Sequence, residues 1–162
     1  MNSKFFDEIV ERFKKPWDKT AFNLYFFVIV ILYGGAGIIA SMYQYFISTT
    51  EQNIYSISQN MATYFIALTA ASLVDIALDY NTKNKPSFAI SSIFTSGLVL
   101  ILFLYAYNTK GTSAFILGFI GILISLFIWV LANYENKKLD DENYYKTVSD
   151  NSQDHGANWG NK

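Results

Sequence analysis

Three of the long stretches without a charged residue restrict the fold more than any other feature. They run from Ala21 to Ser48, from Phe88 to Tyr107 and from Thr112 to Asn133. A helix of about 20 residues crosses about 30 Å of hydrocarbon, because a helix rises about 1.5 Å per residue. Long apolar stretches separated by short polar ones are typical of membrane-spanning helices.

We therefore expect four membrane-spanning helices, at about residues 22–47, 59–78, 88–107 and 113–133. The second is the most polar, because it contains Asp75 and several hydroxyl side chains, and the other helices should shield it. Short connections make sequential helices antiparallel neighbours. The predicted fold is thus all-α: a polytopic membrane protein with an up-down bundle of four helices over residues 21–133.

The first 20 residues predict an amphipathic helix rather than a cleaved signal peptide. Apolar side chains recur there at helical spacing, at Phe5, Phe6, Ile9, Val10 and Phe13. We expect this helix to end at Pro16 and to lie in the cytoplasmic headgroup plane. The first apolar stretch is too long for a signal peptide, so it should be retained as a span.

The composition changes after Asn133. Residues 134–162 are polar and carry charges of both signs. We expect a cytoplasmic tail that is disordered towards its end, because its last residues offer no apolar core.

The distribution of lysine and arginine predicts the orientation. Eleven of the twelve basic residues lie before residue 20, in the 79–87 connection or after residue 133, and the other is Lys110. Basic residues favour the cytoplasmic side. Both termini should therefore be cytoplasmic, in the inner (plasma) membrane of a cell whose composition, rich in Asn, Lys, Ile, Phe and Tyr, suggests an AT-rich bacterial genome.

Most chemistry is disfavoured by what the chain contains. It has no cysteine, one histidine (His155) and one arginine (Arg12), and its net charge is -1. Thiolate nucleophiles and cysteine-ligated metals are thus excluded, and direct nucleic-acid binding is not expected. We find no catalytic motif and expect no catalytic, cofactor-binding or metal-binding residues, so the chain should not be an enzyme.

Asp75 is the ionisable residue that lies inside a predicted span. Ser72, Asp75 and Asp79 are spaced i, i+3 and i+7, which places them on one helix face. An intramembrane carboxylate suggests a cation or proton site. The alternative is an interfacial role, because Asp75 lies about one turn from the cytoplasmic end and could reach water or a lysine.

Small residues form three patches at which helices could approach closely: Gly34, Gly35, Gly37 and Ser41 in the first span, Ala67, Ala70, Ala71 and Ser72 in the second, and Gly118 and Gly121 in the fourth. Such patches allow helix backbones to pack in membranes. They could serve packing within one subunit, or they could form a subunit interface or a pore-lining hinge.

This arrangement of four spans with cytoplasmic termini resembles the family of KwaA, the membrane subunit of the bacterial Kiwa anti-phage defence system. The resemblance is one of layout, over spans near 22–47, 59–78, 88–107 and 113–133. It implies a homo-oligomer that works with a cytosolic partner in antiviral defence. No functional residue can be carried over, because no diagnostic motif is shared.

Two functions are compatible with these features. The first is a non-enzymatic membrane subunit, such as a sensor, that oligomerises and anchors or signals to a cytosolic protein; it follows from the amphipathic helix and the polar tail on one membrane face. The alternative is a small ion channel or proton-coupled transporter that uses Asp75.

Overall fold

The computed structural model describes residues 3–47, 54–78, 85–109, 111–136, 139–141 and 146. Among these residues all elements are helical, so the predicted all-α class is confirmed. The elements, in chain order, are α1 (Ser3–Lys14), η1 (Lys15–Asp18), α2 (Thr20–Leu24), η2 (Tyr25–Tyr33), α3 (Ala36–Ile47), α4 (Ile54–Leu78), α5 (Lys85–Asn108) and α6 (Thr112–Asn133).

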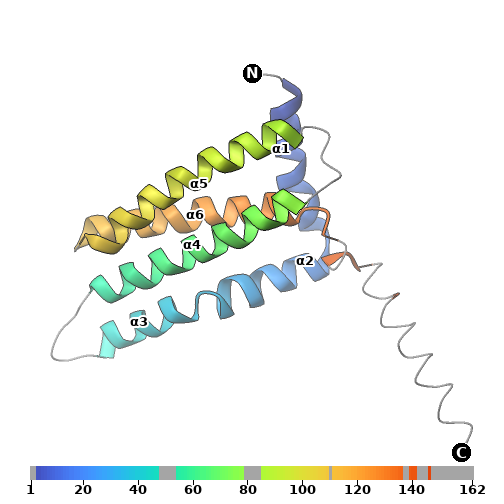
Figure 1. Cartoon of the computed structure of the whole chain (residues 1–162). Helices are drawn as coiled ribbons and strands as arrows, with labels where there is room; N and C mark the ends of the chain where they lie inside the picture. The colour runs from blue at the N-terminus through green and yellow to red at the C-terminus, as the bar shows by residue number, and fades with distance from the viewer. Residues whose placement is uncertain are drawn as a thin grey trace, which may run out of the picture.

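Four long segments lie side by side: the bent segment from α2 to α3, then α4, α5 and α6 (Figure 1). α4 packs along both α6 and α5, and α3 also contacts it. α1 lies across one end of the bundle, at a steep angle to the long helices (Figure 1). α1 ends at Lys14, close to the predicted end at Pro16, and Pro16 lies in the first turn of the 3-10 helix η1, where its missing N–H costs nothing.

Hydroxyl groups connect the two most closely packed helices inside the bundle. The hydroxyls of Thr69 on α4 and Ser125 on α6 are 2.7 Å apart. The Ser125 hydroxyl also lies 2.9 Å from the carbonyl oxygen of Phe65. Both side chains are buried, so their hydrogen bonds replace those that water would otherwise make.

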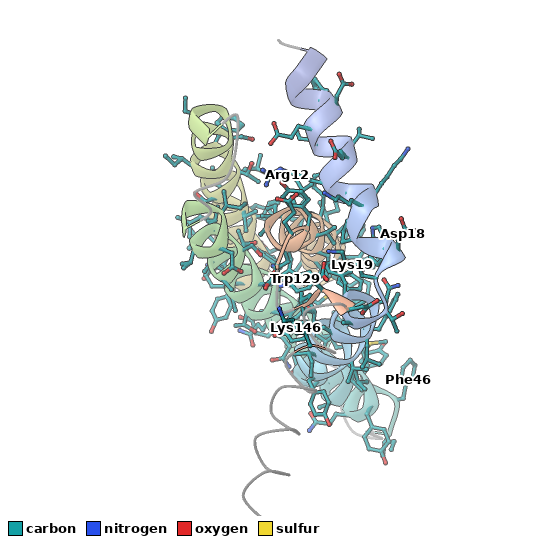
Figure 2. The ribbon with its side chains drawn as sticks, turned by 90° about the vertical axis from the view of Figure 1, so that its right-hand side faces the viewer. Arg12, Asp18, Lys19, Phe46, Trp129 and Lys146 are labelled. Atoms are coloured by element: carbon teal, nitrogen blue, oxygen red, sulfur yellow. The ribbon has the colours of Figure 1, made fainter. Side chains whose placement is uncertain are left out.

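Large apolar side chains point outward from the same bundle. Phe46, Ile93, Phe94 and Ile101 are between 69% and 77% exposed. Figure 2 shows Phe46 directed away from the helices, at the end opposite to α1. The interior is apolar apart from a few polar side chains, most of them small hydroxyls, and so many large apolar side chains on the outside are unusual for a water-soluble domain.

Among the described helices, α6 is long and apolar enough to cross a membrane. The segments Thr20–Tyr33 and Ala36–Ile47 pass the same test if the pair, bent by 48°, is counted as one span. α4 does not pass it, and the apolar part of α5 is the shorter stretch Ile93–Asn108. Spans at 59–78 and 88–107 therefore stay predictions.

Candidate functional site

The first predicted span is broken near its middle. Residues 25–33 form a π-helix, in which the Gly34 N–H donates to the carbonyl of Ile29 at 2.9 Å. The chain then bends by 48° before α3 begins at Ala36. Glycines and π-turns are the usual causes of such bends, because both weaken the regular i to i−4 ladder.

Side chains of α4 hold the broken segment. The Tyr64 hydroxyl donates to the Val30 carbonyl at 2.8 Å. The Asn60 amide donates to the Gly37 carbonyl at 3.1 Å and is also bonded to the Ser41 hydroxyl. Away from water, the carbonyls of a broken helix need such partners.

Gly34 is required where α4 crosses the break. A Cβ at this position would lie 2.9 Å from the Tyr64 ring and would also collide with the Val30 carbonyl oxygen. A larger residue would therefore push Tyr64 away from the carbonyl that it satisfies. The glycine allows the bend and the tyrosine hydrogen bond at the same time.

A cavity of about 500 Å³ lies beside the break. Tyr25, Val30 and Gly37 line it from span one, Asn60 and Ala67 line it from α4, and Trp129 lines it from α6. The rings of Tyr25 and Trp129 are stacked, with centroids 6.0 Å apart. Its volume lies in the range of about 300–1,000 Å³ that is typical of ligand pockets.

The remaining predicted packing residues lie at helix contacts. A Cβ on Gly118 would lie 3.0 Å from the Met61 Cβ, and one on Gly121 would lie 2.5 Å from the Phe65 ring. Gly121 is thus needed where α6 meets α4, whereas a Cβ at Gly118 would make a tight contact with Met61. Gly35 is buried at the bend, where a Cβ would collide with the carbonyl oxygen of Ile31.

The predicted carboxylate site is only partly described. Ser72 is buried and donates to the Leu68 carbonyl at 2.8 Å. Asp75 is exposed on the outer face of α4. Ser72 and Asp75 therefore lie in different environments, although they are only three residues apart on one helix. Asp79 lies outside the described residues.

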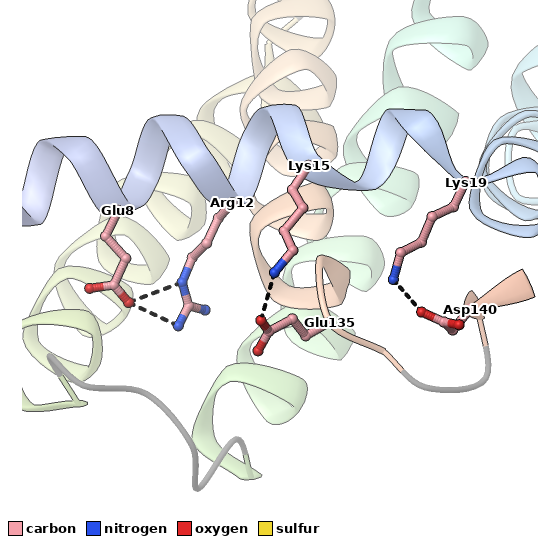
Figure 3. Close-up of polar contacts among 6 residues, drawn as sticks. All are labelled: Glu8, Arg12, Lys15, Lys19, Glu135 and Asp140. Carbon is pink, nitrogen blue, oxygen red and sulfur yellow. Dashed lines mark hydrogen bonds and ion pairs between the residues drawn. The ribbon is translucent and has the colours of Figure 1, made fainter. Parts of the chain in front are cut away.

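A set of polar contacts joins the N-terminal segment to the residues after α6, and we name it the collar. Lys15 pairs with Glu135 at 3.1 Å, and Lys19 pairs with Asp140 at 2.6 Å (Figure 3). The Asp141 carboxylate accepts hydrogen bonds from the backbone N–H groups of Thr20 (3.0 Å) and Ala21 (2.7 Å). Asp141 thus caps the start of span one from about 120 residues away.

Arg12 anchors α1 to the same region. It is only 2% exposed, pairs with Glu8 at 3.1 Å and lies 4.2 Å from the centroid of the Tyr134 ring. Figure 2 shows Arg12 directed from α1 towards the end of α6. A guanidinium over an aromatic face is favourable, so this arginine fastens α1 to the bundle.

The collar also changes the acidity of Glu135. Burial acts to raise the pKa of this carboxyl, but hydrogen bonds from Tyr134 and Lys15, together with the charges of Lys15 and Arg12, lower the pKa below its ordinary value. The carboxylate form is therefore favoured in the folded protein.

Sequence reasoning missed the collar and the break in span one. The collar could have been suspected from Lys15 and Lys19, four residues apart, and Glu135 and Asp140, five apart, which flank the first and last spans. Within the described residues, no group of histidine and acidic side chains could hold a metal ion. Comparisons with protein-family models, curated proteins and solved structures find no match.

Proposed function

We propose that this chain is a non-enzymatic membrane subunit that crosses the bacterial inner membrane four times, oligomerises, and anchors or signals to a cytosolic protein. The polarity of the bundle supports the membrane assignment. A helix that is apolar all round is either buried in a protein or placed in lipid. In α6, only 39% of the most apolar window is buried, so lipid is the better solvent for the rest.

The observation that carries the proposal is the collar. It gathers α1 and the residues after α6 at one end of the bundle (Figure 3). The count of basic residues predicts that this end is cytoplasmic. A folded platform on the cytoplasmic face, from which the polar tail continues, is suited to recruiting a soluble partner.

Reversal of one ion pair tests the platform. Lys15→Glu places two carboxylates together and should loosen the collar, whereas Lys15→Glu combined with Glu135→Lys restores the pair. After crosslinking in native membranes, we expect the wild-type and doubly reversed chains to retain a cytosolic partner and the single variant to retain less. The proposal fails if the wild-type chain, with its tail intact, captures no cytosolic partner.

An antiviral role rests on the KwaA resemblance alone. In a host that carries the chain with its neighbouring genes, deletion of the chain should increase phage plating efficiency. Unchanged plating across a phage panel would remove this part of the proposal and leave the membrane anchor unaffected.

The broken span favours one second candidate, a small channel or proton-coupled transporter. Discontinuous helices line ion sites in many transporters. In this case the wild-type protein in liposomes should conduct ions or protons, and Asp75→Asn should abolish the flux. Absence of flux under any imposed gradient would exclude this alternative.

A further inference from the structure

One face of α4 forms a wall of the cavity, and the Asp75 carboxylate lies further along the same helix. Thr63, Ala67 and Ala71 line the cavity at a spacing of four. Asp75 follows at the same spacing, so it lies one turn beyond the cavity on the same helix face. All four residues are exposed, so the cavity is open along this face as a groove, and Asp75 lies one turn beyond the residues that line it.

Three of the polar side chains that line the groove are already hydrogen-bonded within the protein. Tyr64 donates to the Val30 carbonyl, and Asn60 donates to Gly37 and Ser41. The Thr63 hydroxyl lies 3.1 Å from the carbonyl of Gln59. No charged residue lines the cavity, so the part of an occupant that lies inside it should be uncharged.

The groove opens on the outer surface of the bundle. Tyr25 and Ile29 at its rim are 41% and 43% exposed. In a bilayer this surface faces acyl chains, which fill an apolar groove where water is absent. The end at Asp75 is on the side of the collar, because α4 ends there (Figure 1). The carboxylate is thus at the depth where headgroups begin.

We propose that the groove binds one acyl chain of a cytoplasmic-leaflet phospholipid whose headgroup ammonium pairs with Asp75. This inference rests on the proposed membrane function and names the ligand class of the sensor. A carboxylate just beyond an uncharged groove favours a lipid whose headgroup carries an ammonium group over one whose headgroup carries only a phosphate charge. In this proposal Asp75 binds a lipid headgroup at the surface of the bundle.

Trp129 provides the reporter, because it lines the cavity and is 6% exposed. We would replace the other two tryptophans, Trp17 and Trp159, with Phe and reconstitute the full chain in vesicles that contain lipids with brominated acyl chains, which quench tryptophan on contact. The probes are brominated phosphatidylethanolamine, which carries an amine, and brominated phosphatidylglycerol, which carries none. We expect at least twofold stronger quenching by the amine lipid at equal mole fraction.

Two variants test the site, and one provides the control. Asp75→Asn should remove the difference between the two lipids, and Ala67→Phe should reduce quenching by both, because it fills the groove. Val74→Phe adds the same side chain at an exposed position that does not line the cavity, and it should change neither. Thermal unfolding in detergent confirms that each variant remains folded.

Equal quenching of the wild-type chain by the two lipids would overturn the headgroup assignment. Quenching that Ala67→Phe leaves unchanged would overturn the groove. The quenching assay contains no protein partner, so its result does not depend on partner binding. If the chain prefers the amine lipid but captures no cytosolic partner, only the proposed signalling function is rejected. Capture of a partner without any lipid preference would reject only this inference.

Discussion

At the scale of single residues, Asp141 supplies a helix cap that the local sequence of span one lacks. Lys19, which occupies the cap position, makes no side-chain cap hydrogen bond, whereas the Asp141 carboxylate bonds to two N–H groups of the first turn. Loss of a helix cap costs about 0.5–2 kcal/mol. Asp141→Ala should lower the free energy of unfolding in detergent by this amount, and Asp7→Ala, at an exposed position of α1, should not.

Tyr64 contributes through a single hydrogen bond at the break. Tyr64→Phe removes the donor to the Val30 carbonyl and keeps the ring. Such a bond contributes about 0.5–1.5 kcal/mol, so we expect a loss of that size in detergent unfolding. Tyr43→Phe removes a hydroxyl at a residue that is 67% exposed and serves as the matched control. Equal effects of the two variants would show that the Tyr64 bond does not stabilise the break.

The pH dependence of the collar follows from Glu135. Its pKa is lowered in the folded protein, so the carboxylate stabilises the fold above its ordinary pKa of about 4.3, and this contribution is lost as the pH falls through the lower folded value. Because the pair is half exposed, it contributes no more than about 1 kcal/mol. Wild-type protein should unfold at a higher temperature than Glu135→Gln at pH 7. The difference should shrink below pH ~4, and a difference that grows in acid would contradict the assignment.

At the scale of elements, the contact between α4 and α6 depends on small residues. Gly121→Ala would place a Cβ 2.5 Å from the Phe65 ring, and overpacking of this kind costs about 1–3 kcal/mol. Gly97→Ala meets nothing within 4 Å, and alanine favours a helix interior by about 0.5–1 kcal/mol. Unfolding in detergent should therefore show opposite signs for the two substitutions. A neutral Gly121→Ala would contradict the close packing.

The positions of the long helices could be predicted from the sequence, because charge-free stretches and polar connections are local features. α6, at 112–133, begins and ends within one residue of its predicted bounds. The break at Gly34 and Gly35 was not predicted, because its geometry depends on Tyr64 and Asn60 of another helix. Glycine spacing alone is compatible with both packing and bending.

At the scale of the whole molecule, the collar joins segments at opposite ends of the chain. Its contacts pair residues about 120 positions apart, and a single sequence contains no local pattern that selects such partners. For the same reason the groove was not predicted, although Asp75, one turn beyond it, was singled out from its place in an apolar segment. The sequence thus indicated which residues are unusual, whereas the tertiary structure shows what surrounds them.

In the proposed topology, the chain crosses the membrane four times with both termini in the cytoplasm. The chain has no cysteine, so single cysteines can be introduced at Asn84, Lys110 and Asn161 and treated with a membrane-impermeant maleimide. We predict that Lys110→Cys is labelled from outside intact cells, whereas Asn84→Cys and Asn161→Cys are labelled only after the membrane is opened. If only the first and last helices cross, Asn84→Cys will be labelled in intact cells, and this result would contradict the account.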